Sequence, residues 1–316
     1  AYVLSQRQQE LRRSPVGLDG LQLWLASEGG SAQSFTGGWL LDPAGIGLMV
    51  LPLYDTQPSQ DREPPLTKEQ LLFQQDEDDL DWQSIQVKVS TVPSLIVLPK
   101  WRSGMRLTGI AHPALLVDAS RLDTMLRSLT GETDIRLTRV RQVFTRLPYN
   151  DGTGAVQTAE LYAAQLLDGS ICDPLIGNGP QTLLASCPIA GSDQTVLILS
   201  DPDLLNNHGL RLGQNAEIAR DILLSAAADG SVVIDYSRDN WLADPEEPIQ
   251  RDRTWSDLLR FFQPPFLSLW LGALMTLALI LWRSFRRAGP MLPATTHDAG
   301  KLQAIRARAR LMRLTG

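Results

Sequence analysis

The chain lacks the short motifs that identify several large classes of enzyme. No G-x-S-x-G sequence is present, so the usual signal of a serine nucleophile on a strand-to-helix turn is missing. Neither G-x-x-x-x-G-K nor G-x-G-x-x-G occurs, and the glycines of residues 151–154 therefore indicate a turn rather than a phosphate-binding loop. Internal repeats and heptads are also absent. These absences exclude the sequence-recognisable serine hydrolases, nucleotide-binding loops and repeat architectures.

Basic residues are the minority over most of the sequence. The 316 residues contain 29 Lys and Arg against 35 Asp and Glu. Eight of the bases follow residue 282, where Asp298 is the single acid, so residues 1–282 hold 21 bases and 34 acids. Nucleic-acid binding usually needs a clustered basic face. We therefore expect no nucleic-acid partner.

Charged residues are missing from residues 266–282, an apolar run of 17 residues. The run is at the short end of what crosses a hydrocarbon layer about 30 Å thick, and Trp270 and Trp282 suit the two interfaces. The alternative is a buried core helix, but no cap or polar face interrupts the run. Because the bases follow it, the positive-inside rule places the tail in the cytoplasm and the acidic part outside. The predicted parts are an extracytoplasmic domain (1–262), a transmembrane helix (263–283) and a basic cytoplasmic tail (284–316).

The two ends of the chain add to this topology. From Lys301 onward, apolar residues recur at helical spacing among the bases. This pattern fits an amphipathic helix that lies on anionic lipid or docks a partner, and it equally fits a solvated tail that stops transfer. No signal peptide is visible and the chain begins at Ala1. We therefore expect an upstream segment to export the main domain.

Cysteine and metal-binding patterns are sparse. Cys172 and Cys187 are the only two cysteines, and both belong to the part predicted to face an oxidising compartment. The sequence leaves open whether they form a disulfide. The acidic residues 76–81 lack the glycine and the distant glutamate of an EF-hand loop, so we interpret them as a solvated loop. We expect no metal site and no cofactor.

Apolar runs alternate with amphipathic stretches along the main domain. Strands are predicted at 46–54, 94–98, 181–186, 195–200 and 231–236, and helices at 17–25, 67–75, 120–129 and 214–227. Residues 133–147 favour one or two strands, whereas 155–167 fit either helix or strand. Continuous apolar strands between amphipathic helices predict an α/β fold with a largely parallel sheet covered on both faces.

Ligands of such sheets bind at the carboxyl ends of the strands. The polar side chains at these predicted ends, and in the turns that follow, are Asp55, Lys100, Arg102, Asp201, Asp203, Asn207, His208 and Asn215. One interpretation is a small polar pocket in which Lys100 binds an anion, while the two aspartates and His208 supply hydrogen bonds or metal ligands. The other interpretation is local. The aspartates then cap a short helical turn, and Asn215 helps to start the next helix.

Several stretches resemble a bacterial family of membrane proteins described only as a domain of unknown function, DUF family 4350. They are GLDGLQLWLASEG at 17–29, LIVLPKW at 95–101, residues 200–224 with SVVIDY at 231–236, and the basic segment 286–293 after the apolar run. The most specific part of the resemblance is the D-P-D…N-x-G-L…N-A pattern. It is matched by Asp201, Pro202, Asp203, Asn207, Gly209, Leu210, Asn215 and Ala216.

This resemblance implies a fold similar to the class I glutamine amidotransferase domain, which is flavodoxin-like, with one C-terminal transmembrane helix. It further implies a position outside the bacterial inner membrane, between two spans, of which the first is not in this sequence. Genes of the family often lie near those for a MoxR-type ATPase and other membrane proteins. The implied partners are therefore the lipid bilayer, envelope membrane proteins and that ATPase.

Amidotransferase catalysis does not follow from this resemblance. The nucleophilic cysteine of these enzymes sits between glycines on a sharp turn, and neither Cys172 nor Cys187 has flanking glycines. Pro188 also removes a backbone N–H expected at an oxyanion hole. We therefore expect a membrane-anchored, non-catalytic binding or assembly module of the cell envelope. The alternative is a hydrolase or metal-dependent enzyme that uses the two aspartates and His208 at the strand ends.

Overall fold

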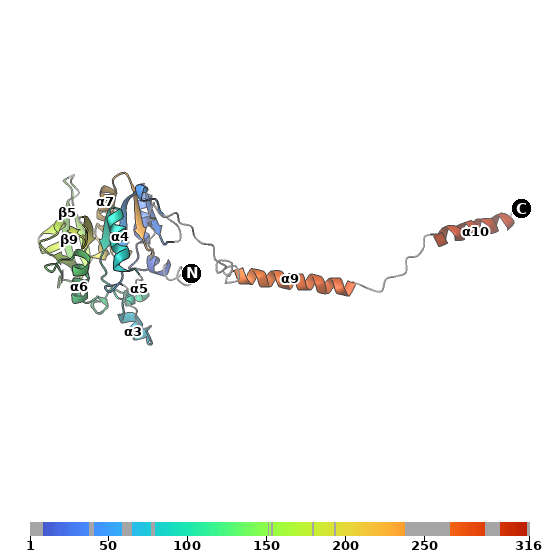
Figure 1. Cartoon of the computed structure of the whole chain (residues 1–316), viewed down its shortest axis with the longest axis horizontal. Coiled ribbons are helices and arrows are strands. Elements are labelled where there is room, and N and C mark those ends of the chain that lie inside the picture. Colours follow the sequence, from blue (N-terminus) through green and yellow to red (C-terminus); the bar gives the residue numbers. More distant parts are fainter. Residues whose placement is uncertain are drawn as a thin grey trace. The chain divides into compact units, whose positions relative to one another are not determined.

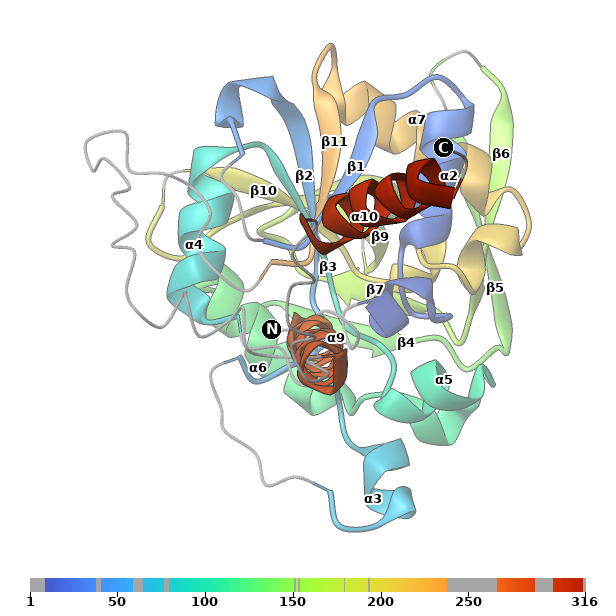
Figure 2. The same ribbon diagram turned by 90° about the vertical axis from the view of Figure 1, so that its right-hand side faces the viewer.

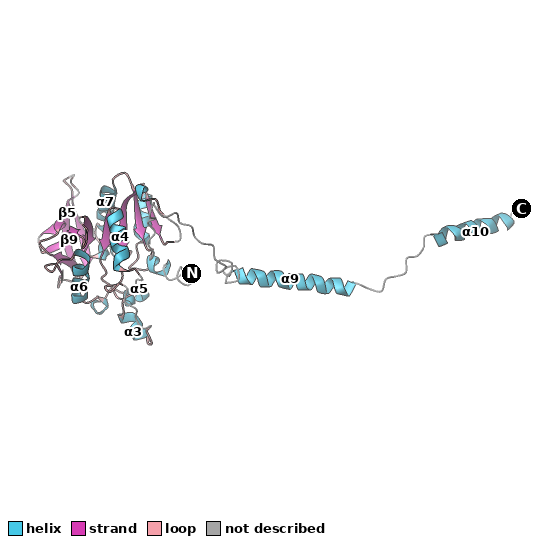
Figure 3. Cartoon of the chain, viewed as in Figure 1, coloured by secondary structure: helices cyan, strands magenta, loops and turns pink. Residues whose placement is uncertain are grey.

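The computed structural model describes residues 9–37, 41–58, 65–76, 80–150, 152, 154–178, 180–192, 194–237, 266–287 and 298–314. The chain divides into two compact units, Ala1–Glu247 and Pro248–Gly316. The first unit is a mixed α/β domain, and the described residues of the second, 266–287 and 298–314, form two helices (Figures 1 and 3). The predicted domain boundary at residue 262 lies outside the described residues.

A nine-stranded sheet forms the centre of the first unit. Its strand order is β1-β11-β2-β3-β10-β9-β7-β4, and β8 pairs with β9. The five parallel strands are β1 (Ala32–Phe35), β11 (Ser231–Asp235), β2 (Ile46–Pro52), β3 (Ser94–Val97) and β10 (Thr195–Leu199). The antiparallel ones are β9 (Gln181–Pro188), β8 (Asp173–Asn178), β7 (Gln165–Asp168) and β4 (Arg136–Arg139). The predicted parallel sheet is thus confirmed for one half, and the antiparallel extension was not foreseen.

Two layers cover the faces of the sheet. Helices α4 (Trp82–Thr91) and α6 (Ala119–Thr130) lie on one side, and α2 (Asp19–Ser27) and α7 (Asn215–Ala227) on the other, as Figure 2 shows. A hairpin of β5 (Phe144–Asn150) and β6 (Val156–Tyr162) extends the second layer.

Strand β2 shows how the sequence supplies both layers. Successive side chains of a strand point to opposite faces. Met49 and Leu51 therefore pack into the core beneath α4 and α6, whereas Leu48 and Val50 pack into the core beneath α2 and α7. A strand buried on both faces must be apolar at every position, which is why this run was readable from the sequence.

The remaining elements of the domain are short. They are α3 (Lys68–Phe73), α5 (Ser103–Thr108) and the 3₁₀ turns η1 (Pro43–Gly45), η2 (Pro113–Leu115), η3 (Pro202–Leu204) and η4 (Gly209–Arg211). Helix α3 begins with a capping box between Thr67 and Gln70. Helix α6 ends at Gly131, whose φ of 77° is a conformation that glycine adopts without strain.

The acidic run at 76–81 is not simply a solvated loop. Asp76 is buried and pairs with Arg106 at 2.8 Å. The Asp81 carboxylate accepts a hydrogen bond from the Ser84 amide and caps the start of α4. Our interpretation is wrong for Asp76, which is buried with a specific partner, whereas Asp81 is exposed to solvent as expected and in addition caps a helix; residues 77–79 lie outside the described part.

The two cysteines are joined. The Cys172–Cys187 disulfide links the segment that leads into β8 with β9, and both residues are buried. The bond therefore closes a loop of the antiparallel half of the sheet, a pairing that the sequence had left open.

The second unit contains α9 (Phe266–Arg287) and α10 (Asp298–Leu314). Residues Leu267–Phe285 of α9 are long and apolar enough to cross a membrane, with a mean hydropathy of 1.5. At 1.5 Å per residue the 22 residues of α9 extend about 33 Å, against about 30 Å of hydrocarbon. The predicted apolar helix is thus present and compatible with membrane anchoring.

Candidate functional site

Lys100 and Asp201 meet at the carboxyl edge of the parallel half of the sheet. Lys100 follows β3 and Asp201 follows β10, and these strands are parallel neighbours. The Lys100 Nζ lies 2.9 Å and 2.8 Å from the two carboxylate oxygens of Asp201 and 2.8 Å from Asp203 Oδ2. It also donates to the Tyr162 carbonyl at 2.6 Å. A lysine and two aspartates, all inaccessible to solvent, therefore form a closed ion cluster.

Neighbouring donors satisfy the remaining carboxylate positions. Asp201 accepts hydrogen bonds from the backbone amides of Gln165 and Asp203, each at 2.9 Å. Asp203 Oδ1 accepts from the Trp101 indole N–H and from the Asn206 side-chain amide, each at 2.8 Å. Every carboxylate oxygen of the cluster thus has at least one donor within the domain, as a buried charge requires.

Burial and charge act against each other in the pKa values of the cluster. Burial raises the pKa of Asp201 to about 6, with repulsion from Asp203 adding to the shift and attraction to Lys100 opposing it. Burial alone would also raise the pKa of Asp203, but Lys100 and the hydrogen bond from Trp101 hold it below its ordinary value. Burial alone would lower the pKa of Lys100, yet the two carboxylates hold it above its ordinary value. One ammonium between two carboxylates leaves a net negative charge, and Asp201 is the group that takes up a proton first.

We expect the free energy of unfolding to carry a signature of Asp201 between about pH 6 and pH 4. In this window the folded chain holds a proton on Asp201 that the unfolded chain, with an ordinary value of 3.8, does not. The contribution of this carboxyl to stability therefore rises as the pH falls through about 6, and above that pH it is a constant penalty. Asp201→Asn has a fixed neutral side chain and lacks this dependence.

The measurement is urea-induced unfolding of the wild-type chain and of Asp201→Asn from pH 7 to pH 4.5. The wild type is expected to gain stability relative to the variant as the pH falls, while carboxylates outside the cluster affect both proteins alike. A difference between the two proteins that stays constant across this range would contradict the prediction.

His208 lies beside the cluster without joining it. Its Nδ1 is 3.9 Å from Asp203 Oδ1, too far for a hydrogen bond, and this buried atom has no hydrogen-bond partner among the described residues. Burial lowers the pKa of His208, so its ring is neutral at neutral pH. The ring stands edge-on to Trp101, with centroids 6.2 Å apart.

Asn207 and Asn215 connect chain segments. Asn207 accepts from the Gly20 amide at 2.7 Å and donates to the carbonyls of Arg12 and Ser14. Asn215, the first residue of α7, accepts from the Glu160 amide and donates to the Glu160 and Gly209 carbonyls. These side chains bond to the backbone of other segments. The local interpretation is therefore wrong for Asn215, because its side chain caps no amide of α7.

Arg102 and Asp55 have partners of their own. Arg102 contacts both carboxylate oxygens of Asp118, at 3.1 Å and 3.2 Å, and donates to the Phe73 and Leu116 carbonyls. Asp55 is buried and accepts from the Gln57 amide at 3.0 Å. Of the eight predicted residues, the structure therefore brings Lys100, Asp201 and Asp203 into one cluster with His208 beside them.

Gln165 is a member of the site that sequence reasoning missed. It is fully buried, and its side-chain amide donates to the carbonyls of Pro99 and Ser200. The Ser200 hydroxyl in turn donates to the backbone carbonyl of Gln165. The only signal was one polar residue at the start of an apolar strand, β7. Such a residue becomes informative only when the strands beside it are known.

A second buried ion pair was also missed. Lys88 of α4 lies 2.9 Å from Asp235 Oδ2 at the end of β11, and both side chains are inaccessible to solvent. Lys88 also donates to the carbonyl and the hydroxyl of Ser237. A lysine within an amphipathic helix usually faces solvent, so the sequence pattern concealed this contact.

The space next to the cluster is small. A cavity next to Lys100, Trp101 and Asn206 has a volume of about 20 Å³, which is room for about one water. Among the described residues, no three His, Cys, Asp or Glu side chains are grouped as metal ligands. The ammonium of Lys100 occupies the place between the carboxylates of Asp201 and Asp203.

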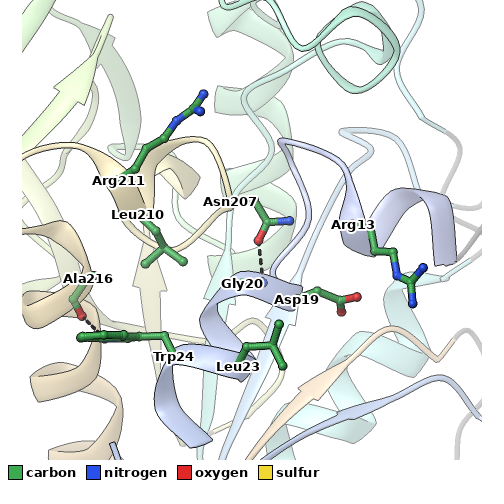
Figure 4. Close-up of a pocket in the computed structure, with 9 residues that line it drawn as sticks. All are labelled: Arg13, Asp19, Gly20, Leu23, Trp24, Asn207, Leu210, Arg211 and Ala216. Carbon is green, nitrogen blue, oxygen red and sulfur yellow. Dashed lines mark hydrogen bonds between the residues drawn. The ribbon is translucent and has the colours of Figure 1, made fainter. Parts of the chain in front are cut away.

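A larger hollow lies on the surface between α2 and η4. This groove has a volume of about 490 Å³ and is drawn in Figure 4. Trp24 forms one wall and is fixed by a hydrogen bond from its indole N–H to the Ala216 carbonyl. Leu23 and Leu210 supply further apolar surface. Asp19 pairs with Arg12, so the remaining charges of the rim are Arg13 and Arg211.

Comparison with known proteins adds little to this geometry. No protein-family model matches the chain, and no curated protein matches it. A solved structure described as the mmIFT52 N-terminal domain is similar, with 11% sequence identity and a TM-score of 0.32. The likeness covers 57% of this chain and 97% of that one, and at this TM-score it carries no argument about fold or function.

Proposed function

We propose that this protein is a membrane-anchored, non-catalytic binding or assembly module of the bacterial cell envelope. The observation that carries the proposal is the closure of the ion cluster. Lys100 has no free donor, each carboxylate oxygen has a donor, and none of the three side chains is accessible to a reactant. Catalytic groups need an open site within reach of the substrate.

The cluster suits a structural role instead. It joins the ends of β3 and β10 to Tyr162 and Gln165 on either side of the turn between β6 and β7. A buried ion pair contributes little net stability against an apolar replacement, but it fixes the partners that meet. We infer that the cluster sets the geometry of the carboxyl edge and leaves recognition to the surface.

The groove between α2 and η4 is the surface that we assign to recognition. It combines fixed apolar walls with two arginines on its rim, an arrangement that suits an apolar side chain next to an anionic group. Asn207 ties the groove to the cluster side of the domain, since it bonds the Gly20 amide at the start of α2. The ligand class we propose is a peptide segment with an apolar anchor flanked by a carboxylate.

The family resemblance extends the proposal to fold and location. We propose an amidotransferase-like fold facing outside the inner membrane, with the basic tail in the cytoplasm. The parallel half of the sheet, the apolar α9 and the bases after residue 282 support it. The disulfide agrees with an oxidising compartment. A MoxR-type ATPase and envelope membrane proteins are the partners that the resemblance suggests.

The proposal predicts where each part of the chain lies and what the groove contacts. Reporters fused after Gly316 and within residues 55–65 are expected to show the tail inside and the loop outside. Leu23 is 70% exposed in the groove. A photo-crosslinking residue at this position is expected to form a crosslinked product of defined size with a partner outside the membrane. The matched position is Leu66, which is 89% exposed and lies outside the groove.

Three results separate the parts of the proposal. The groove adduct should disappear when Arg13 and Arg211 are both replaced by alanine, because the rim charge is then lost. A loop that reports inside would overturn the envelope location. Adducts of equal yield at Leu23 and Leu66 would overturn the assignment of the groove.

A further inference from the structure

Helix α10 presents a narrow apolar stripe. At 100° per residue, the side chains of Leu302, Ile305, Ala309 and Met312 fall on one face of the helix. Leu302, Ile305 and Met312 are 55%, 66% and 72% exposed. Leu311 and Leu314, which are 64% and 83% exposed, lie on another face near the C-terminal end of the helix, so the stripe is the longer of the two apolar surfaces. Large apolar side chains that share one face and are exposed need a covering surface.

Two rows of bases border this stripe. Lys301 and Arg308 lie on one side of it, and Arg306, Arg310 and Arg313 lie on the other. All five are exposed. The side chains of lysine and arginine are long and flexible, so their charged ends can bend away from the apolar stripe and remain in a polar layer while the stripe is buried. Positive charge therefore lies on both sides of the apolar face, two bases on one side and three on the other.

This arrangement matches the boundary between lipid headgroups and acyl chains. When an interfacial helix buries its apolar face about 5–10 Å deep, the flanking bases reach the headgroup level and meet anionic lipid. A soluble protein groove would need acidic rims on both sides to offer the same complementarity, whereas an anionic leaflet offers it in every direction. We propose that α10 lies flat on the anionic surface of the membrane that α9 crosses, with Leu302, Ile305, Ala309 and Met312 facing the acyl chains.

The connection to α9 makes such contact favourable. Eleven residue steps separate Arg287 from Asp298, which limits their separation to about 40 Å even when the chain is fully extended. A helix tethered this closely meets the surface at a high effective concentration, so weak affinity suffices. The inference rests on the proposed membrane insertion of α9, and its test must distinguish the two.

The experiment uses the full chain, reconstituted in phosphatidylcholine vesicles with or without 30% phosphatidylglycerol. Single cysteines are introduced by Met312→Cys on the stripe, by Ala307→Cys on the opposite face of α10, and by Leu277→Cys within α9. Each is labelled with an environment-sensitive dye under non-reducing conditions, so that the native disulfide stays intact. Quenching by spin-labelled lipid then reports the depth of each position.

The label at position 312 is expected to be quenched with phosphatidylglycerol and to lose most of its quenching without it, while the label at 307 stays in water. Replacing Arg306, Arg310 and Arg313 by glutamine should lower the ratio of bound to free helix on the order of a hundredfold, since each base near an anionic surface contributes about a fivefold factor. High salt should act in the same direction.

The label at position 277 separates the two hypotheses. If it is unquenched in all vesicles, the anchoring of α9 fails. If 277 is quenched but 312 remains in water with anionic lipid, the inference about α10 is overturned and the anchor stands. If the label at 312 is shielded from water equally in both lipids, or remains shielded in detergent, α10 packs on protein. That result would also overturn the inference about α10.

Discussion

Replacing Lys100 by methionine is expected to lower the free energy of unfolding by about 3–5 kcal/mol. The variant keeps most of the side-chain volume but removes the ammonium that lies between Asp201 and Asp203, both fully buried. Two carboxylates without a counter-charge must then be protonated or exposed to water, and either response costs free energy. Urea-induced unfolding of the detergent-solubilised chain, followed by fluorescence, measures the change.

Lys68→Met is the matched control for this measurement. Lys68 is exposed at the start of α3, so the same substitution there should change stability by no more than about 0.5 kcal/mol. Adding Asp203→Asn to Lys100→Met should recover part of the loss, because one of the uncompensated charges is then removed. Equal stabilities of the Lys100 and Lys68 variants would show that the cluster does not form.

Loss of the Cys172–Cys187 bond is expected to have the next largest effect, about 3 kcal/mol. The bond closes a 15-residue separation, and a loop of this length restricts the unfolded chain by roughly that amount. The double variant Cys172→Ala with Cys187→Ala removes it. Thermal and urea unfolding of this variant and of the wild type, each with and without reductant, provide the measurement.

Reductant serves as the internal control for the disulfide. It should destabilise the wild type to about the level of the double variant and leave the double variant unchanged. If wild type and double variant unfold at the same urea concentration in the absence of reductant, the bond contributes nothing. The loop from β8 to β9 would then be held by strand pairing alone.

The parallel half of the fold could be predicted because its strands are apolar on both faces. Short apolar runs such as β2, β3 and β10, bounded by turn signals, predict buried strands, and Leu21 and Leu25 identified the buried face of α2 in the same way, with Leu18 just before the helix. Trp24, at helical spacing with these leucines, is instead half-buried at the surface groove. The antiparallel half was harder to predict from the sequence. Strands β6 and β7 belong to a segment whose pattern fitted either helix or strand, and their pairing became clear only in three dimensions.

Helix α4 shows a different limit. Its inward positions are Ile85, Lys88, Val89 and, just after the helix, Val92, a helical spacing in which one member is charged. The charge conceals an otherwise regular stripe. Asp235, the residue that makes this lysine acceptable in the interior, lies about 150 residues later in the chain. No local pattern connects the two.

The sequence indicated which side chains meet at the candidate site, but not whether they form an open pocket or a closed cluster. Lys100, Asp201 and Asp203 follow adjacent parallel strands, so their meeting follows from topology. Whether such side chains form an open pocket or a closed cluster depends on donors that come from elsewhere. Here the Tyr162 carbonyl and the Gln165 amide fill those positions. Tyr162 gives no sign in the sequence that it belongs to the site, and Gln165 gives only that of a polar residue at the start of an apolar strand.

The position of β11 has a mechanical consequence for an anchored protein. In sequence the chain continues from β11 to α9, so a force on the proposed anchor would reach the first unit at the end of this strand. β11 lies between β1 and β2 and is parallel to both. At its end, Lys88 forms an ion pair with Asp235 and donates a hydrogen bond to the Ser237 carbonyl. Extracting it would require two ladders of hydrogen bonds to shear together and a buried ion pair to break. In the proposed anchored protein, a pull from the membrane therefore acts first on a strand that is paired on both sides, the second from the β1 edge of the sheet, and not on an edge strand.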